Sequence, residues 1–535
     1  MDPSTSQLQP ATFAEFQQDA KRGNVVAVAR TVLSETMNPI DAFVNVAGDR
    51  GGARYAFLFE SVEGGAGVAK YSFLGANPYM VVRGEDNVTT IEREGETESR
   101  EECLTDYLRR HFRENKLASR VDLGPLAGGA VGYLGYRAAR WFEPALNKQD
   151  DNYSQGGPPR DEQSDDGDDA LLMFYRTLVV FDRVEGEVRI VSVVFTDEAS
   201  GDEGRLRKLY ETAVRETERI ELLLGTSAQH PSIDPGRSPT VREGLPEPSP
   251  NATVHSNWSE RDFHHAVREV KEHIFAGDCY QAVISQRFTR DVSVGAVPIY
   301  RALRQSNPAP YTYLLKVGDE AIIGASPEML VRCRGPQLDY RPIAGTRPRG
   351  ATETEDNLLA EEMRFDEKEV AEHMMLVDLG RNDLGRVAEY GSVKVEELMS
   401  VERYSKVQHL VSSLSARLRV GSDRFDALAA CFPAGTVTGA PKVRAMEIIR
   451  QLEPDERGVY AGAVLYMDYA DNLDSCIAIR TIVLRNGKAS VQAGAGIVAD
   501  SVPEREYEET VHKAQALLRA IEIAEEEDLA ADLRG

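Results

Sequence analysis

Two acidic stretches carry glutamate pairs at a spacing that could serve a cation. In GAGIVADSVPEREYEET, residues 494–510, Glu506 and Glu509 are three residues apart, and residues at this spacing are neighbours on a helix. DEKEVAEHMML, residues 366–376, repeats the spacing with Glu369 and Glu372. Two such helices facing each other would offer the oxygen ligands that Mg²⁺ prefers. The alternative is two solvated helices that never meet, because acidic residues favour the first turn of any helix.

The helices and strands that would position these carboxylates follow from periodicity. Helical spacing of apolar residues is clear in 258–277, 367–380, 441–452 and 505–526. Strand pairs are predicted for 171–182 with 188–195 and for 312–317 with 321–326, and a meander for 462–469, 476–484 and 489–498 with a turn at Asn486-Gly487. Long antiparallel sheets with helices on the outside make an α+β protein.

Two polar stretches organise the chain. Residues 145–168 are acidic and contain Gly and Pro, which is typical of a surface insertion. Residues 226–256 are rich in Pro and Ser and lack periodicity, which predicts a linker. The chain is therefore expected to divide into an N-terminal part, 1–225, and a C-terminal part, 257–535.

Charge and cysteine usage exclude several classes of protein. A formal net charge of −25 over 535 residues disfavours nucleic acid and anionic membranes as partners. The five cysteines are scattered and odd in number, which disfavours zinc and a disulfide framework and fits a reducing cytosol. The N-terminus lacks the pattern of a signal peptide, and no run of 18 apolar residues could span a bilayer. We expect a cytoplasmic protein without a membrane partner.

The C-terminal part resembles the chorismate-utilising enzymes, and within them the family of anthranilate synthase large subunits. The supporting blocks occur in family order across about residues 258–520. They include GDCYQAVISQRF, GASPEML, RPIAGTRPRG, KEVAEHMMLVDLGRNDLG, FPAGTVTGAPKVRAM, DSCIAIRT and the stretch 494–510. The resemblance implies large antiparallel sheets packed face to face with helices outside. It also implies Mg²⁺-dependent amination of chorismate at C2, followed by loss of pyruvate to give anthranilate, the first step of tryptophan biosynthesis.

The resemblance also implies roles for individual residues. Glu372 and Glu509 match the carboxylates that bind magnesium directly, and Glu369 and Glu506 match those that hold its waters. Glu328 matches the general acid, which needs a raised pKa to stay protonated, and His409 is assigned to the loss of pyruvate. The positions that match substrate-binding residues are Thr346, Thr436, Tyr460, Arg480, Gly494 and Gly496. Lys442, in GAPK, is left outside the site, and Pro441 is expected at the first helical position.

Two positions distinguish this chain from related activities. Isochorismate and salicylate synthases carry a lysine where this chain has Gln281, and glutamine cannot act as their base on water. Aminodeoxychorismate synthases use a lysine where this chain has Ala344, and a methyl group cannot act as a nucleophile. Both differences favour direct attack by ammonia, which makes Gln281 a candidate catalytic residue. The alternatives are an aminodeoxychorismate or aminodeoxyisochorismate synthase and, in another class, a catalytically inactive tryptophan-binding regulatory protein.

A regulatory site and a partner subunit are implied in the same way. FLFES and NPAPYTY resemble the family's tryptophan-sensing motifs, so the N-terminal part is expected to be regulatory and feedback-inhibited by tryptophan. The matching positions are Glu60, Ser61, Lys70, Pro310, Tyr311, Thr312 and Tyr466. A carboxylate near the ligand amine would suit Glu60. No glutaminase-type cysteine elbow is found, so ammonia is expected from a glutamine amidotransferase subunit, component II, in a hetero-oligomer.

Overall fold

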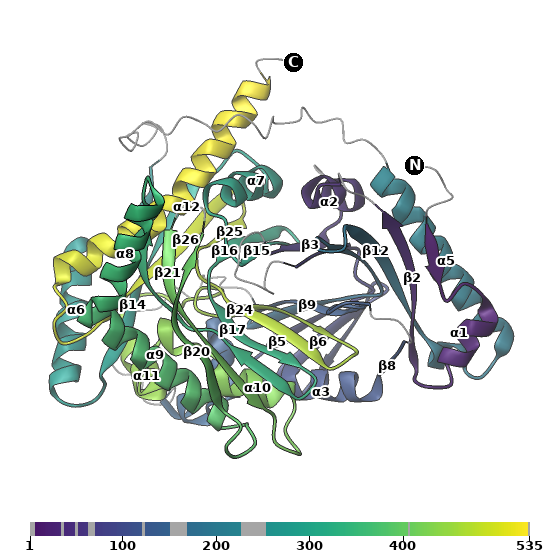
Figure 1. The fold of residues 1–535 in the computed structure, drawn as a ribbon, viewed down its shortest axis with the longest axis horizontal. Coiled ribbons are helices and arrows are strands. Elements are labelled where there is room, and N and C mark those ends of the chain that lie inside the picture. Colours follow the sequence, from purple (N-terminus) through teal and green to yellow (C-terminus); the bar gives the residue numbers. More distant parts are fainter. Residues whose placement is uncertain are drawn as a thin grey trace.

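Two large antiparallel β-sheets face each other across the centre of the molecule (Figure 1). The computed structural model describes residues 6–33, 37–48, 52–61, 70–119, 123–149, 168–225, 253–404 and 407–532. Helices lie on the outer sides of the sheets (Figure 1). The predicted α+β class is confirmed.

The first sheet contains 14 of the described strands. In spatial order they are β1 (Gln7–Gln9), β2 (Val25–Leu33), β12 (Glu187–Phe195), β11 (Thr177–Asp182), β4 (Tyr71–Ala76), β3 (Tyr55–Glu60), β15 (Tyr311–Val317), β16 (Glu320–Ser326), β25 (Thr481–Arg485), β26 (Lys488–Ile497), β14 (Gln281–Asp291) and β13 (His255–Ser256), with β22 (Gly439–Ala440) on β14 and β8 (Leu117–Ala118) on β2.

The second sheet contains 12 of the described strands. In order they are β19 (Ile343–Pro348), β21 (Val407–Arg417), β18 (Gln337–Tyr340), β17 (Met329–Arg334), β24 (Asn472–Ile477), β23 (Ala463–Asp468), β9 (Gly129–Leu134), β10 (Ala170–Tyr175), β5 (Met80–Glu85), β6 (Val88–Arg93) and β7 (Glu96–Arg100), with β20 (Lys394–Arg403) on β21.

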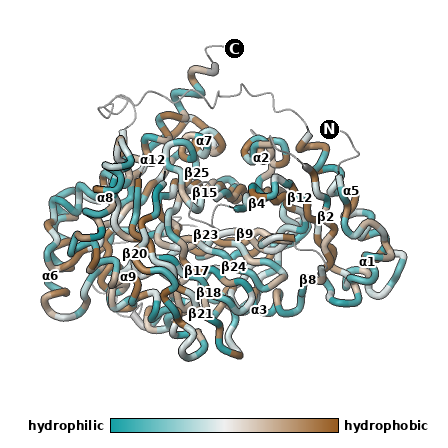
Figure 2. Tube along the Cα trace, in the orientation of Figure 1, coloured by the Kyte–Doolittle hydropathy of each residue, from teal (hydrophilic) through white to brown (hydrophobic). Residues whose placement is uncertain are grey.

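The helices cover the outer faces with amphipathic sides, and Figure 2 shows hydrophobic and hydrophilic residues alternating along α7 and α12. The α-helices are α1 (Phe13–Asp19), α2 (Pro39–Ala47), α3 (Leu104–Glu114), α5 (Glu203–Gly225), α6 (Glu260–Phe275), α7 (Ala296–Ser306), α8 (Glu353–Phe365), α9 (Glu367–Gly385), α10 (Arg424–Cys431), α11 (Lys442–Leu452) and α12 (Pro503–Asp532). Short 3₁₀ helices are η2 (Tyr136–Trp141), η3 (Pro144–Gln149), η4 (Thr196–Ala199) and η5 (Gly435–Val437). No helix of the described ranges is long and apolar enough to cross a membrane.

The main hydrophobic core lies between the two sheets. It joins Tyr313 and Ile322 of the first sheet to Val131, Val331 and Leu465 of the second, all almost fully buried. A further cluster packs α2, α5, α7 and α12 against the outer face of the first sheet. This burial from both sides makes the first sheet a rigid support, because well-packed interiors deform little.

Each sheet combines strands from before and after residue 226. β3 pairs with β15, and β9 pairs with β23. Residues 226–252 of the predicted linker and residues 150–167 of the predicted insertion lie outside the described residues, whereas His255–Ser256 form a paired strand and 145–149 belong to η3. A functional division into two parts stays a prediction, but it does not separate two sheets.

Two apolar runs that were each predicted as one strand pass from one sheet to the other. Residues 171–182 break at Arg176 into β10 of the second sheet and β11 of the first. Residues 476–484 break between β24 and β25, and Arg480 in that break has φ = +49°. The predicted meander is therefore wrong between β24 and β25, whereas the β25–β26 hairpin at Asn486-Gly487 is confirmed.

Candidate active site

Glu328 lies buried between β16 and β17, only 6% exposed. Its backbone is held at both ends, since its N–H donates to Ser326 Oγ at 3.3 Å and its carbonyl accepts from the N–H of Ile477 at 3.0 Å. Within the described residues, neither Glu328 Oε1 nor Thr436 Oγ1 makes a hydrogen bond of good geometry, although the two groups lie close enough for the Thr436 hydroxyl to lower the pKa of Glu328. A buried polar atom without a partner is costly unless something else is bound there, so both atoms point to a ligand.

Burial raises the pKa of the Glu328 carboxyl to about 8, while the nearby Thr436 hydroxyl and Arg480 guanidinium oppose the rise. The largest cause is desolvation, which penalises the charged form of a carboxyl group. At neutral pH this carboxyl group is therefore mostly protonated. It can donate a proton in the middle of a polar site.

His409 lies on β21 beside Thr346 of β19. Its Nδ1 is 2.9 Å from the carbonyl oxygen of Gly345 and 3.1 Å from Thr346 Oγ1. Because a carbonyl oxygen only accepts, Nδ1 carries the proton and Nε2 has a free lone pair. Burial lowers the pKa of His409, so the ring is neutral and able to accept a proton.

Gly494 and Gly496 lie in strand β26, within the strand predicted for residues 489–498. A Cβ at Gly494 would lie 2.7 Å from Tyr460 Oη, and a Cβ at Gly496 would lie 2.8 Å from Gln281 Nε2. Neither residue has a positive φ, so close approach, rather than backbone conformation, requires glycine here. The two glycines let the polar ends of Tyr460 and Gln281 reach the strand.

The two glutamate pairs come within electrostatic reach of each other. Desolvation raises the pKa of Glu372, as do the neighbouring carboxylates of Glu369 and Glu509. Desolvation also raises the pKa of Glu506, with Glu509 contributing. The pairs on α9 and α12 therefore lie close enough to influence each other, and we call these four carboxylates the acidic cluster.

Two basic residues neutralise part of this cluster. Arg347 Nη1 lies 3.0 Å from Glu369 Oε1, and Lys513 Nζ lies 2.6 Å from Glu509 Oε1 and 2.9 Å from the carbonyl oxygen of Gly494. Across the described residues, no three His, Cys, Asp or Glu side chains are arranged to hold a metal ion by themselves. The donors nevertheless fit Mg²⁺, which takes one or two carboxylates and completes its shell with waters and substrate oxygens.

These contacts connect the predicted catalytic, substrate-binding and metal residues into one site. A Cβ at Gly345, next to Thr346, would lie 3.1 Å from Glu369 Oε2, which joins the histidine to the acidic cluster. A cleft of about 460 Å³ opens beside Arg480, Glu509 and Lys513. Ligand sites of roughly 300–1,000 Å³ are usual.

One residue that sequence reasoning left out, Arg457, supports this site. Arg457 is fully enclosed, donates to the carbonyl oxygens of Val437 and Val283, and lies 4.8 Å from the ring centroid of Tyr136 and 5.6 Å from that of Tyr460. It lies in PDERG, which reads as an exposed turn, so the sequence carried no signal for it.

Three residues that were considered in the sequence but not assigned to the active site have structural roles. Lys442 pairs with Asp383 at 3.2 Å, which joins α11 to α9, and Pro441 is the N-cap residue rather than the first helical residue. Ala344 is buried in β19, paired with Leu410.

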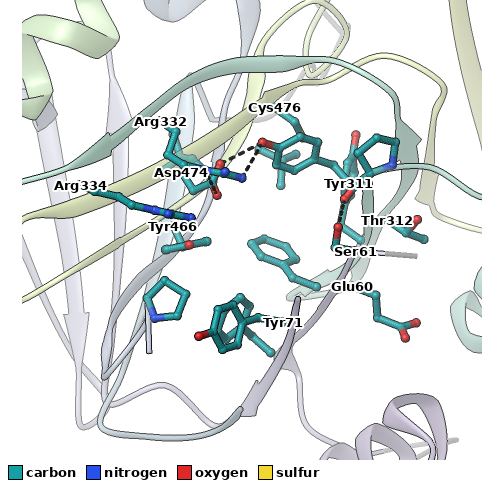
Figure 3. A pocket seen from close by; sticks show the side chains of 17 residues that line it. Glu60, Ser61, Tyr71, Tyr311, Thr312, Arg332, Arg334, Tyr466, Asp474 and Cys476 are labelled. Atoms are coloured by element: carbon teal, nitrogen blue, oxygen red, sulfur yellow. Dashed lines mark hydrogen bonds and ion pairs between the residues drawn. The ribbon is translucent and has the colours of Figure 1, made fainter. Parts of the chain in front are cut away.

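A second pocket lies between the sheets, with a cavity volume of about 70 Å³ (Figure 3). Of the seven residues predicted to sense tryptophan, six line it: Glu60, Ser61, Pro310, Tyr311, Thr312 and Tyr466. Ser61 Oγ donates to the carbonyl oxygen of Pro310 at 2.8 Å (Figure 3). Aromatic rings of Phe59, Tyr71 and Phe73 form an apolar side. These rings offer a surface against which a flat apolar group can pack.

Two of the predicted pocket residues differ from expectation. The Glu60 side chain is fully buried and points away from the pocket (Figure 3), where its carboxylate accepts from Tyr300 Oη at 2.7 Å and pairs with Arg183 and Arg304. It is thus committed to other partners and does not offer its charge to a ligand amine. Lys70 lies outside the lining and pairs with Asp182 at 3.5 Å.

The charged groups in the pocket are ones that the sequence did not single out. Asp474 accepts from Arg332 Nε at 2.7 Å and from Tyr311 Oη at 3.1 Å (Figure 3). Arg334 also lines the pocket and, among the residues described, has no ion-pair partner. Asp474 is the first residue of the block DSCIAIRT, but the neighbouring sequence does not indicate that Asp474 faces the strand formed by FLFES.

Sequence comparisons place the chain among known proteins. The family described as chorismate binding enzyme matches residues 56–519. The anthranilate synthase component 1 of Acetivibrio thermocellus is 42% identical over 96% of this chain and 99% of its own length. That of Pseudomonas putida is 41% identical over 94% of this chain and 96% of its own length.

Solved structures show the same architecture. Anthranilate synthase component I from Streptococcus pneumoniae superposes with a TM-score of 0.68 at 35% identity, covering 84% of this chain and 92% of that one. MenF, the menaquinone-specific isochorismate synthase from Escherichia coli, gives a TM-score of 0.65 at 18% identity, covering 93% and 95%, and this likeness concerns the fold alone.

Proposed function

Because the chain belongs to the chorismate binding enzymes, in the group of anthranilate synthase component 1, we propose that it converts chorismate and ammonia into anthranilate, pyruvate and water. The observation that carries this proposal is Glu328. Its buried carboxyl group has a pKa of about 8 and an unpartnered oxygen, and it lies beside Arg480 and Thr436. It joins an acidic cluster suited to Mg²⁺ in one continuous site.

The first half of the reaction needs an acid. Ammonia attacks C2 of the ring, the double bonds shift, and the C4 hydroxyl leaves as water after receiving the Glu328 proton. Arg480 and Tyr460 hold the enolpyruvyl carboxylate, and guanidinium groups suit carboxylates because they bind both oxygens. Gly494 and Gly496 leave room beside β26, and Thr346 and Thr436 line the ring.

The second half needs a base. His409 Nε2 takes the proton from C2, the bond between C3 and the ether oxygen breaks, and the enolate of pyruvate leaves as the ring becomes aromatic. The enolate then takes up a proton, for which the His409 imidazolium is a source, and becomes pyruvate. The carbonyl oxygen of Gly345 fixes the required tautomer by accepting from Nδ1. The lowered pKa of His409 keeps it neutral before this step.

Magnesium is proposed as the cofactor, with Glu372 and Glu509 as direct ligands and Glu369 and Glu506 as partners of its waters. Bound there, it would neutralise the ring carboxylate of the substrate and fix its position. Lys513 and Arg347 balance two of these carboxylates in the chain as it stands. A site of this kind allows an acidic protein to bind a dianionic substrate.

A partner subunit is proposed to supply the ammonia from glutamine, as the name component 1 implies for the relatives. The complex would be a hetero-oligomer in the cytoplasm. All five cysteines are described and free, four of them buried, which suits a reducing compartment.

Purified chain incubated with chorismate, Mg²⁺ and ammonium should develop anthranilate fluorescence. Chromatography separates this product from the aminated intermediates that an aminodeoxychorismate or aminodeoxyisochorismate synthase would release. Accumulation of such an intermediate, with no anthranilate, would contradict the proposal.

Gln281→Lys is expected to lower ammonia-dependent anthranilate formation by about tenfold or more, since an increase of about 1.4 kcal/mol in the barrier suffices. Gln281 is 8% exposed and its amide lies beside Gly496. A positive charge there would repel ammonium and crowd the incoming nitrogen. Gln281→Met, which keeps length without charge, is the control, and the readout is product analysis at saturating chorismate. Unchanged output from the lysine variant would remove residue 281 from the site.

Tryptophan is proposed as a feedback inhibitor that binds the pocket at Ser61 and Tyr311. The aromatic side would hold the indole, and the pocket is also lined by the charged side chains of Arg334 and Asp474. Glu60 lines the pocket as well, and its carboxylate is paired with Arg183 and Arg304, as that of Asp474 is with Arg332.

Ser61→Arg is expected to raise the inhibition constant for tryptophan by about 100-fold while sparing kcat. The new side chain would fill the pocket and bring a third positive charge next to Arg332 and Arg334. Ser61→Ala is the matched control; it removes only one hydrogen bond, worth about 0.5–1.5 kcal/mol, so its effect should stay within about tenfold. Inhibition curves give both values, and equal inhibition of Ser61→Arg and parent would place the inhibitor elsewhere.

A further inference from the structure

One side chain of the second pocket, Tyr313, contacts the residue next to Arg480. Tyr313 lines the pocket from β15, is 2% exposed, and its Oη lies 2.7 Å from Thr481 Oγ1. Tyr313 pairs with Gly324 on β16, and Gly324 pairs with Thr481 on β25. The three residues are thus in register across three neighbouring strands.

Gly324 is what allows the tyrosine to cross its neighbouring strand. A Cβ at Gly324 would lie 2.2 Å from Tyr313 Cζ and 2.4 Å from its Oη, a separation that side chains do not adopt. The ring therefore lies directly over the glycine. Any larger residue would displace the hydroxyl from Thr481.

The hydroxyl acts on the turn that carries Arg480. Thr481 Oγ1 donates to the carbonyl oxygen of Ile479 at 3.0 Å, so the proton between Tyr313 and Thr481 comes from the tyrosine. Arg480, enclosed between these residues, has φ = +49°, and its carbonyl accepts from the N–H of Ala325 at 3.1 Å. A left-handed conformation costs a non-glycine residue roughly 1–2 kcal/mol, so it persists only where neighbouring contacts hold it.

The same pocket wall also supports the general acid. Cys476 lines the pocket, and the next residue, Ile477, donates its N–H to the carbonyl oxygen of Glu328. The break between β24 and β25 therefore has Cys476 of the pocket at one end and Arg480 at the other, and Ile477 in the same segment contacts Glu328. A ligand that moves this part of the pocket wall would therefore move residues that contact Glu328 or precede Arg480.

We propose that Tyr313 and Thr481 are positioning residues for Arg480, and that a ligand in the pocket at Ser61 and Tyr311 weakens chorismate binding by loosening the Tyr313–Thr481 hydrogen bond. The inference rests on the proposed function, in which Arg480 holds a substrate carboxylate. A ligand changes an equilibrium only through unequal affinity for two states. Here the two states are the turn at Arg480 with the Tyr313–Thr481 hydrogen bond formed and the same turn with that hydrogen bond broken.

The test measures KM for chorismate in the presence and absence of tryptophan. Tyr313→Phe and Thr481→Val should each raise KM by about two- to twelvefold, the equivalent of one hydrogen bond at about 0.5–1.5 kcal/mol, with kcat nearly unchanged. The ratio of KM with and without tryptophan should fall towards one. Calorimetry should still show tryptophan binding, because the pocket remains. Combining the two substitutions should add little, since both remove the same bond.

Two further variants separate positioning from a general structural effect. Thr481→Ser keeps the hydroxyl and should restore KM and the tryptophan response, which distinguishes it from Thr481→Val even if Tyr313→Phe folds poorly. Tyr79→Phe removes another buried hydroxyl contact, 3.0 Å to Tyr469 Oη, and should change neither.

The measurements distinguish failure of this inference from failure of the proposed function. A parent enzyme that makes anthranilate but is not inhibited by tryptophan would overturn the regulatory half of the inference, and the KM values without tryptophan would still test positioning. Parent-like KM and inhibition in both Tyr313→Phe and Thr481→Val would overturn the inference and leave the proposed reaction intact.

Discussion

Glu328→Gln is expected to lower kcat/KM for anthranilate formation by about 10²–10⁴-fold, the usual contribution of a positioned general acid. The amide has nearly the shape of the carboxyl group, so the fold should persist, but it cannot deliver a proton to the leaving hydroxyl. Steady-state fluorescence assays give the ratio, and circular dichroism checks the fold. Glu320→Gln, which alters a carboxylate paired with Arg485 away from the site, is the control.

The pH profile provides an independent test of the same residue. Glu328 acts in its protonated form, which predominates below its pKa of about 8. In the parent, kcat/KM should therefore fall as pH rises through about 8. The residual activity of Glu328→Gln should lack this decrease. A parent profile that stays flat from pH 7 to about 9 would contradict the assignment of the acid.

Glu509→Gln is expected to lower Mg²⁺-dependent turnover by about 100-fold or more, equivalent to at least 2.7 kcal/mol in the barrier, within the several kcal/mol that a bound metal supplies. The substitution removes one charge from the proposed ligands and also the ion-pair partner of Lys513. Isothermal titration calorimetry with MgCl₂, with and without chorismate, should show weakened binding. Glu504→Gln, at the start of the same helix but outside the cluster, is the control.

Two outcomes would contradict the assignment of Glu509 as a magnesium ligand. If Glu509→Gln binds Mg²⁺ as tightly as the parent and turns over normally at limiting Mg²⁺, the acidic cluster is not the metal site. An effect of the same size in Glu504→Gln would instead indicate a general dependence on the charge of α12.

The sequence predicted the helices α6, α9, α11 and α12 and the hairpins β11–β12, β15–β16 and β25–β26, because their signals are local. The spacing of Glu369 and Glu372 and of Glu506 and Glu509 follows from helical geometry alone. Their encounter across the cleft followed only from family resemblance, since spacing within one helix says nothing of its neighbour. The structure brings the two pairs together.

The sequence could not reveal where an apolar strand changes sheets. CIAIRTIVL reads as one continuous run, and the break at Arg480 depends on packing between β24 and β25 that no local pattern records. The direction of the Glu60 side chain was missed for a similar reason. Strand alternation fixes the face on which a residue lies, but Arg183 and Arg304 approach from distant parts of the chain.

The interleaving of both halves in each sheet has a consequence for synthesis on the ribosome. β3 acquires its neighbour β15 only after about 250 further residues have been made, and β9 waits longer for β23. At roughly 5–20 residues per second, the first of these intervals lasts about 10–50 s. During this time the nascent chain presents strand edges with free backbone donors and acceptors, which invite pairing with other chains. We therefore expect newly made chains to depend on chaperones until the last strands arrive.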